Sequence, residues 1–427
     1  MITENLNDTL RKKWISKEEL KLRDEIVSGT TDKKEQYKSS CYEVMVHKLC
    51  NEKCFFCSQD HASRTTAIKP DDKDIYNRIL FWAKQWYGML GFTGGEPLIH
   101  RHILKYIRFW RKAWFSFVRI QTNWVMLWKD TFVKDCIDAG ATLFKLSIHS
   151  HKSDIHDWLV WLPWALKKCE DGIRSIRKYG WRIGINIVLT QQNYRELPEF
   201  LLHFLNLWVT SFVIIFPLYE HSMFDERNKV WFKFSDAIPY VVKSLKIFDK
   251  LNLRRPLVLN LPMCLLPWYE DAIIQTFNGT AILNLDGTKI NIDDNKAWWK
   301  IRVPTCNDCE HRQICFGVDE WYIEKWWDGE FQTRLDTISG NTNIDDIIFQ
   351  EYFTEDELCF LELLKRKSPL NIDDILTMKD DIQICKDCDS MNKIISTWDI
   401  LERKWLLKKS IWEGWKIIYS KIRSVWA

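Results

Sequence analysis

The chain has 427 residues, 46% of them hydrophobic, which is enough for one large domain with smaller modules beside it. Its 61 basic and 58 acidic residues leave a formal net charge of +3, which argues against a nucleic-acid-binding protein and against binding to an anionic membrane. The 13 cysteines are odd in number and mostly clustered, a pattern typical of metal ligation in a reducing compartment rather than of a disulfide framework.

Residues 1–41 are polar and rich in Lys and Glu, so we expect a helical or partly disordered leader. They lack the apolar core of a signal peptide, and we therefore expect a cytoplasmic protein. Residues 200–219 carry no formal charge, but they include His203, Asn206 and Pro217. This composition favours a buried helix followed by a buried strand, and we predict no transmembrane helix.

Strands and helices alternate from residue 42 onward. Apolar runs predict six strands, at 42–48, 88–93, 117–122, 142–148, 182–189 and 211–218. Helical periodicity predicts helices at 72–85, 100–113, 130–139, 166–179, 195–207 and around 236–250. This alternation predicts an α/β fold with a parallel sheet and right-handed crossovers.

The character of the sequence changes after residue 250. Asp286 and Gly287 lie between two β-rich runs and predict a hairpin turn, which is followed by a cysteine-rich segment. Beyond about Glu330 the sequence is acidic and helical in pattern, and it ends in a tail rich in Lys and Trp. We therefore predict four parts: the leader 1–41, a core domain 42–250, a cysteine-rich module 251–330 and a helical extension 331–427.

The segment CNEKCFFC places Cys50, Cys54 and Cys57 on one loop after the first predicted strand. Three thiolates on a loop hold three irons of a [4Fe-4S] cluster and leave the fourth iron open for a chelating ligand. A zinc knuckle is the alternative, although zinc sites usually have four protein ligands. A second element, FTGGEP (92–97), ends the second predicted strand.

Together, CNEKCFFC and GGEP resemble the radical SAM enzymes. The resemblance covers about residues 42–250 and implies a partial (β/α)6 barrel of the TIM type, with its chemistry at the C-terminal ends of the strands. It implies two cofactors, a [4Fe-4S] cluster and S-adenosylmethionine. It also implies reductive cleavage of S-adenosylmethionine to a 5′-deoxyadenosyl radical, which abstracts a hydrogen atom from a substrate.

The resemblance implies that several residues bind S-adenosylmethionine. Phe56 matches the family's aromatic residue near the adenine, although a core aromatic is the alternative. Gly94, Gly95 and Glu96 match the GGE element, whose backbone and carboxylate meet the amino group of the methionine part.

Polar residues at the ends of the third and fourth predicted strands are weaker candidates. Ser147 matches a position that reaches the ribose hydroxyls, and Asn123 is near enough to join that network; either side chain could instead cap its strand. Of the three histidines in SIHSHKSDIH, only His149 is well placed for the pocket, whereas His151 and His156 are predicted to be solvated polar residues.

A second cysteine group consists of Cys264, Cys306, Cys309 and Cys315. Its spacing resembles the auxiliary-cluster modules of radical SAM enzymes, the SPASM and twitch types, and implies a second [4Fe-4S] cluster with four thiolate ligands. Asp319 stands where a full SPASM pattern has a further cysteine, which favours a single twitch-like cluster. A structural zinc site is the alternative.

The substrate is a peptide or protein, or else a small molecule of cofactor biosynthesis, if the family resemblance holds; a non-catalytic cluster or zinc scaffold is the rival hypothesis. Expected partners are the substrate and an electron donor such as flavodoxin or ferredoxin, with no nucleic acid and no membrane. Cys385 and Cys388 form a further CxxC that we leave unassigned.

Tryptophan outnumbers glycine in this chain, 24 to 15, although glycine makes up about 7% of ordinary chains. Many of these tryptophans lie in turns or just after helices, where a left-handed backbone favours glycine. The clearest are Trp114, Trp124, Trp161, Trp164, Trp208 and Trp268. Our hypothesis is that the source reads the codon UGA as glycine; a chain rich in aromatic residues is the alternative.

Overall fold

The computed structural model describes most of residues 41–331, and less of the chain beyond. Within 41–331 it leaves out 58, 60, 62–69, 84–88, 113–116, 219–225, 275–279, 292–299 and 327–328. Beyond 331 it describes 355–366, 370–371, 375, 378, 397, 400–401, 407–412 and 416–421. The chain divides into two compact units, residues 1–245 with 254–339 and residues 246–253 with 340–427.

One ten-stranded sheet organises the first unit, in the order β10-β9-β1-β2-β3-β4-β5-β6-β7-β8. Neighbouring strands from β1 to β8 pair in parallel, as do β1 and β9. The first six strands are β1 (Cys41–His47), β2 (Met89–Gly94), β3 (Phe117–Thr122), β4 (Leu143–Ser147), β5 (Arg182–Val188) and β6 (Ser211–Ile215). The predicted α/β fold, a partial barrel of the TIM type, is therefore confirmed.

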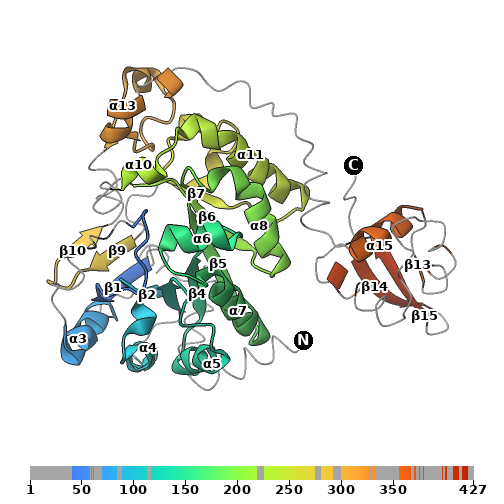
Figure 1. The fold of residues 1–427 in the computed structure, drawn as a ribbon, viewed down its shortest axis with the longest axis horizontal. Coiled ribbons are helices and arrows are strands. Elements are labelled where there is room, and N and C mark those ends of the chain that lie inside the picture. The colour runs from blue at the N-terminus through green and yellow to red at the C-terminus, as the bar shows by residue number, and fades with distance from the viewer. Residues whose placement is uncertain are drawn as a thin grey trace, which may run out of the picture. The chain divides into compact units, whose positions relative to one another are not determined.

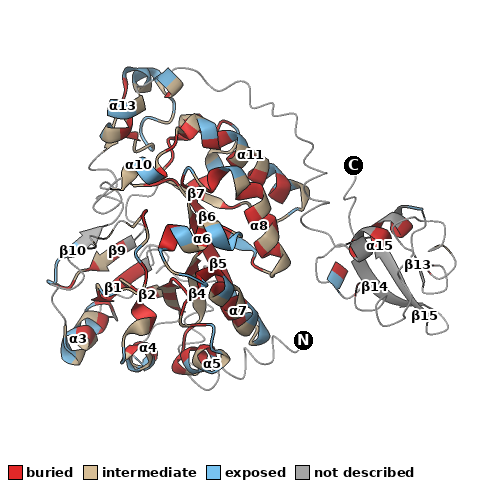
Figure 2. Cartoon of the chain, viewed as in Figure 1, coloured by how far each residue is buried: buried red, intermediate tan, exposed pale blue. Residues whose placement is uncertain are grey.

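Helices connect these strands, and Figure 1 shows most of them along the outer side of the curved row of strands. They are α3 (Asp72–Ala83), α4 (Ile103–Lys112), α5 (Asp130–Ala139), α6 (Ser153–Val160), α7 (Ala165–Lys178), α8 (Leu197–Asn206), α10 (Arg227–Val230) and α11 (Phe234–Lys250). In α4, Ile103, Tyr106, Ile107 and Trp110 are buried, which is the spacing of one helix face packed on a sheet. Figure 2 shows that the central strands are largely buried.

The uncharged stretch at 200–219 divides as predicted into part of helix α8 and strand β6. Most of α8 is buried, including Phe200 and Phe204, and the middle residues of β6 are buried as well. Strand β6 is apolar because a covered parallel sheet buries its strands on both faces. Helix α8 is apolar where it covers such a sheet. In the described part of the chain, no helix is long and apolar enough to cross a membrane.

The predicted hairpin consists of β9 (Thr280–Leu283) and β10 (Lys289–Asn291), which pair antiparallel. Gly287 has a φ of 85°, and Asp286 Oδ1 accepts the N–H of Thr288 at 2.9 Å. Because β9 also pairs with β1, the hairpin extends the sheet next to the strand that leads into the three-cysteine loop. The opposite edge adds β7 (Leu257–Leu259) and β8 (Ile273–Ile274), which are too short to leave a periodic pattern in the sequence.

The C-terminal unit differs from the helical extension we expected. Its described part contains helix α15 (Glu355–Arg366) and a three-stranded antiparallel sheet in the order β13-β15-β14. The strands are β13 (Leu370–Asn371), β14 (Leu407–Trp412) and β15 (Lys416–Lys421). In β15 the sequence KIIYSK is rich in β-branched and aromatic residues, which favour a strand despite the flanking lysines.

Among the residues that the structure describes, five tryptophans have a left-handed backbone, which is the conformation expected of glycine. Their φ angles are 74° at Trp124, 53° at Trp161, 64° at Trp164, 66° at Trp208 and 68° at Trp268. Each such residue with a Cβ costs roughly 1–2 kcal/mol, so five together approach the net stability of a typical domain, about 5–15 kcal/mol. Trp114, the sixth position that we singled out, lies outside the described residues.

Two neighbouring tryptophans test this strain. Trp161 follows the end of α6 with a φ of 53°, whereas Trp158 lies inside the same helix, and both rings pack on Phe55. We expect Trp161→Gly to raise the free energy of unfolding by about 1 kcal/mol, because glycine accepts this φ. Trp158→Gly should lower it by about 0.5–1 kcal/mol, because glycine disfavours a helix interior. Urea unfolding measures both; a loss of stability in Trp161→Gly would contradict the strain.

Candidate functional site

A cavity of about 360 Å³ opens at the C-terminal ends of the parallel strands. The ends of β2 to β7 contribute to its wall, together with the loop that follows β1. All residues predicted around the first cluster and S-adenosylmethionine lie in this wall: Cys50, Cys54, Phe56, Cys57, Gly94, Gly95, Glu96, Asn123 and Ser147. Parallel strands bring these distant segments together because their carboxyl ends meet at one edge.

Two glycines at the end of β2 lie against the backbone of the three-cysteine loop. Gly94 has a φ of 132°, and a Cβ there would lie 2.0 Å from the carbonyl oxygen of His47. A Cβ on Gly95 would lie 2.0 Å from the carbonyl oxygen of Leu49. The N–H of Gly95 donates to His47 O at 2.9 Å, and the N–H of Glu96 donates to Leu49 O at 2.8 Å. The start of the three-cysteine loop is thus hydrogen-bonded to the end of β2. It lies so close that a side chain on Gly94 or Gly95 would clash with it.

The carboxylate of Glu96 is buried and engaged by the protein itself. Its Oε1 accepts the N–H of Leu98 at 2.8 Å and the hydroxyl of Thr122 at 2.7 Å, while its Oε2 accepts the N–H of Asn123 at 2.6 Å. Burial raises the pKa of Glu96 to about 7, and these three hydrogen bonds oppose that rise. In this structure the carboxylate joins the ends of β2 and β3; its contact with the amino group of S-adenosylmethionine stays a prediction.

Asn123 connects the end of β3 to the three-cysteine loop. Its Nδ2 donates to Asn51 Oδ1 at 2.8 Å and lies 3.8 Å from the sulfur of Cys50. Ser147 lies at the end of β4, where it pairs with Asn186 of β5, and both residues line the cavity. Asn123 therefore has a structural role in the described contacts, and the ribose contact of Ser147 stays a prediction.

The three-cysteine loop is built to present thiolates to the cavity. Cys50 Sγ accepts the N–H of Glu52 and Cys57 Sγ accepts that of Gln59, each at 3.4 Å. Cys54 Sγ donates to Glu52 Oε2 at 3.3 Å, and burial, then the charge of Glu52 and the neighbouring thiolates, raises the pKa of Cys54. Three cysteines on one wall, two of them receiving backbone N–H bonds, fit three ligands of an iron-sulfur cluster.

Phe56 and His149 form the apolar side of the same wall. Their ring centroids lie 4.1 Å apart, and burial lowers the pKa of His149 far enough to keep the ring neutral near pH 7. His149 Nδ1 accepts the N–H of Val188 at 3.2 Å. His149 lines the wall, whereas His151 and His156 do not. The expectation that these two are solvated is wrong for His156, which is fully buried.

Sequence reasoning missed two asparagines of the wall, Asn186 and Asn260. Asn186 interrupts the apolar run of β5, and its Oδ1 is buried without a partner among the described residues. A polar residue within a buried strand is the signal that could have indicated it. Asn260 has a φ of 64° and donates from Nδ2 to the carbonyl oxygen of Phe216 at 3.0 Å.

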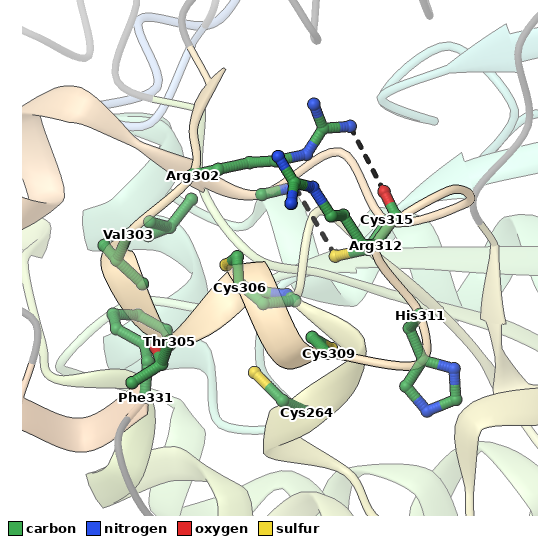
Figure 3. A pocket seen from close by; sticks show the side chains of 13 residues that line it. Cys264, Arg302, Val303, Thr305, Cys306, Cys309, His311, Arg312, Cys315 and Phe331 are labelled. Carbon is green, nitrogen blue, oxygen red and sulfur yellow. Dashed lines mark hydrogen bonds between the residues drawn. The ribbon is translucent and has the colours of Figure 1, made fainter.

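The second cysteine group also comes together. Cys264, Cys306, Cys309 and Cys315 line a cavity of about 60 Å³, and Figure 3 shows the four thiols around the same hollow. Burial, then the thiolates of the other three cysteines, raises the pKa of Cys264 to about 12. Folding thus brings Cys264 to three cysteines that lie about forty positions later, as the four-ligand set requires.

The surroundings of this second group are cationic, because Arg302 and Arg312 line the same cavity. Arg302 donates to the carbonyl oxygen of Arg312 at 3.3 Å, and its charge opposes the rise that burial causes in the pKa of Cys306. Asp319, which replaces a cysteine of the full SPASM pattern, instead forms a buried ion pair with Lys300 at 2.7 Å. That pair joins β11 (Lys300–Ile301) to β12 (Val318–Asp319).

The cysteines of neither group converge on the position of one metal ion. In the regions that the structure describes, no other three Cys, His, Asp or Glu side chains do so either. Cys385 and Cys388 lie outside the described residues.

The buried Glu96 gives a pH-dependent prediction. We expect Glu96→Gln to lower the free energy of unfolding by about 1–3 kcal/mol, because an amide cannot accept all three hydrogen bonds. The folded pKa of about 7 lies above the ordinary glutamate value of 4.5. The stability from this carboxyl group is therefore complete below the lower value and is lost as pH rises through the higher one. Urea unfolding should show the difference between wild type and Glu96→Gln shrinking across that window.

The exposed Glu324 of helix α13 (Glu320–Trp326) is the matched control. Glu324→Gln should change the free energy of unfolding by less than about 0.5 kcal/mol, both below and above this pH window. A pH-independent difference between wild type and Glu96→Gln would contradict the raised pKa.

Comparisons with known proteins agree with this geometry. Residues 44–204 match the family model of the Radical SAM superfamily. A Sulfurisphaera tokodaii protein named probable GTP 3′,8-cyclase is 27% identical over 160 residues, which are 36% of this chain and 49% of that protein. The tungsten-containing aldehyde ferredoxin oxidoreductase cofactor-modifying protein of Pyrococcus furiosus is 26% identical over 187 residues, or 41% of this chain and 51% of that protein. The chain thus spans about half the length of these curated relatives.

A solved structure shows the same fold. Streptococcus suis SuiB bound to its precursor peptide SuiA superposes with a TM-score of 0.50 at 17% sequence identity, covering 72% of this chain and 77% of SuiB. The cysteine loop, the GGEP turn and the parallel sheet lie within or beside the matched residues 44–204. Over residues 44–204 the chain is thus similar to the Radical SAM superfamily.

Proposed function

We propose that this protein is a radical SAM enzyme that holds a [4Fe-4S] cluster on Cys50, Cys54 and Cys57 and binds S-adenosylmethionine in the adjoining cavity. The observation that carries the proposal is the close backbone packing of the three-cysteine loop on Gly94 and Gly95 at the cavity wall. When bound, the reduced cluster and S-adenosylmethionine supply a 5′-deoxyadenosyl radical that abstracts a hydrogen atom from the substrate.

The chain's own residues position the ligands and exclude water. The backbone of Gly95 and Glu96 fixes the start of the loop, and Asn123 fixes Asn51 within it. Apolar side chains from three strand ends complete the wall: Val188, Ile215 and Leu259. Such a wall keeps solvent hydrogens away from a radical.

We propose a peptide or protein as the substrate. Support comes from SuiB, a protein of the same fold that was solved with its precursor peptide. The curated relatives favour a second candidate, a small molecule of cofactor biosynthesis, since one is named a GTP 3′,8-cyclase and the other a cofactor-modifying protein. Both of those similarities span about half of the relatives, so the choice between the candidates belongs to experiment.

We also propose that Cys264, Cys306, Cys309 and Cys315 hold one further [4Fe-4S] cluster. Four thiolates fill every protein-ligand position of such a cluster, which suits electron transfer rather than chemistry at an open iron. The cationic neighbours Arg302 and Arg312 favour the anionic thiolates. An electron donor such as flavodoxin or ferredoxin would reduce the first cluster.

The activity is tested by anaerobic release of 5′-deoxyadenosine from S-adenosylmethionine by the reconstituted, dithionite-reduced protein. We expect release that falls at least about a hundredfold in Cys54→Ala, because that thiolate is one of three cluster ligands. Cys136→Ala is the matched control, since Cys136 is a buried thiol outside the cavity wall, and it should retain most of the release. Iron-loaded wild-type protein that releases no 5′-deoxyadenosine would contradict the proposal.

Metal analysis tests the second cysteine group. With two clusters, we expect iron and sulfide per protein to fall by about half in Cys309→Ser and by a similar amount in Cys54→Ser. A zinc site at the second group would instead give a Cys309→Ser protein with unchanged iron and less zinc.

A further inference from the structure

Several helices of this chain end in a residue with a left-handed backbone. At the end of α5, the N–H of Gly140 donates to Ile137 O at 2.9 Å and the N–H of Ala141 donates to Cys136 O at 3.0 Å. This pair of bonds is the Schellman motif, in which the left-handed residue is usually glycine. The end of α7 has the same pair, with Gly180 as the left-handed residue.

Tryptophan takes the place of glycine in the same motif at two other helix ends. At the end of α8, the N–H of Trp208 donates to Leu205 O at 2.8 Å and the N–H of Val209 donates to Phe204 O at 3.0 Å. At the end of α6, Trp161 and the residue after it make the corresponding bonds, to Trp158 O at 3.2 Å and to Asp157 O at 3.0 Å. The end of α11 has this pair as well, with Asn252 as the left-handed residue. Among the described helices with this motif, two therefore end in glycine, one in asparagine and two in tryptophan.

The side chains at these positions give no reason for tryptophan. Trp164 is 74% exposed, Trp268 72% and Trp161 63%, so the largest apolar side chains point into solvent. Trp124 is fully buried, but its indole N–H has no partner among the described residues.

We propose that the protein made by its natural source has glycine at positions 124, 161, 164, 208 and 268, because UGA codons there are read as glycine. The written sequence then results from reading UGA as tryptophan. This also accounts for the excess of tryptophan over glycine, 24 to 15. The proposal does not depend on the function of the cavity.

The recoding matters for the candidate site because position 124 directly follows Asn123. The backbone of Asn123 holds Glu96, and its side chain holds Asn51 in the three-cysteine loop. A tryptophan with a φ of 74° strains the backbone at this junction. Glycine at 124 relieves that strain where β3 meets the loop.

Peptide mass spectrometry of the protein purified from its source tests the proposal. A tryptic peptide, residues 120–129, contains position 124, and another, residues 153–167, contains 161 and 164. We expect the residue mass of glycine at all three positions, and TGA codons at all five in the gene. The residue mass of tryptophan at these positions, or TGG codons there, would overturn the proposal.

A second inference concerns His149 and rests on the proposed function. Its ring is fixed by the N–H of Val188 on Nδ1 at 3.2 Å and by the ring of Phe56, while its carbonyl oxygen accepts from Asn193 Nδ2 at 2.8 Å. Because Nδ1 of the neutral ring accepts a hydrogen bond, the ring proton is on Nε2. His149 lines the cavity, and no group among the described residues bonds to its Nε2.

We infer that the Nε2–H of His149 donates a hydrogen bond to an acceptor atom of bound S-adenosylmethionine. Equilibrium dialysis of S-adenosylmethionine against the reconstituted protein tests this. His149→Asn keeps an acceptor near the place of Nδ1 and loses the donor, so we expect about tenfold weaker binding. His203→Asn is the matched control, because the His203 ring hydrogen-bonds Glu170 at 2.9 Å and the residue is absent from the cavity wall.

Unchanged affinity in His149→Asn would overturn the inference about His149. An equal loss in His203→Asn would also overturn it, because the effect would then not arise at the cavity wall. A wild-type protein that holds its iron and does not bind S-adenosylmethionine would contradict the proposed function instead.

Discussion

The candidate site depends on a contact between two stretches of backbone. Gly94 and Gly95 lie so close to the carbonyl oxygens of His47 and Leu49 that a Cβ on either glycine would overlap them. This contact sets where the three-cysteine loop begins. It also places Glu96 so that its carboxylate reaches the end of β3, where Asn123 turns back to Asn51 in the loop. Hydrogen bonds thus connect the end of β2 to the loop, the end of β2 to the end of β3, and the end of β3 back to the loop.

The second cysteine group lies in the same compact unit as the first. The hairpin of β9 and β10 adds to the sheet beside β1, the strand that leads into the first cysteine loop. In the second cysteine group, Cys264 precedes this hairpin and the other three cysteines follow it, and the four thiols lie beside two arginines. Both groups of thiols belong to one compact unit, as transfer of electrons between the two proposed clusters would require.

Much of the fold could be predicted because buried parallel strands and amphipathic helices have strong periods. The six predicted strands begin and end within three residues of β1 to β6, and the Asp286–Gly287 turn lies where its chemistry indicated. The two- and three-residue strands β8 and β7 have no detectable period, and the sheet of the C-terminal unit was hidden by lysines. The internal hydrogen bonds of Glu96 depend on Thr122 and Leu98, which no local pattern connects. The backbone of five tryptophans, by contrast, followed from turn chemistry alone.

We propose that the three-cysteine loop holds a cluster with one iron open to S-adenosylmethionine. Electron paramagnetic resonance of the reconstituted, reduced protein, recorded with and without S-adenosylmethionine, is the sharpest test of this proposal. We expect a [4Fe-4S] signal whose shape changes when S-adenosylmethionine is added, because the cofactor would then coordinate the open iron. An identical spectrum at saturating S-adenosylmethionine, in protein whose iron content shows a complete cluster, would contradict it.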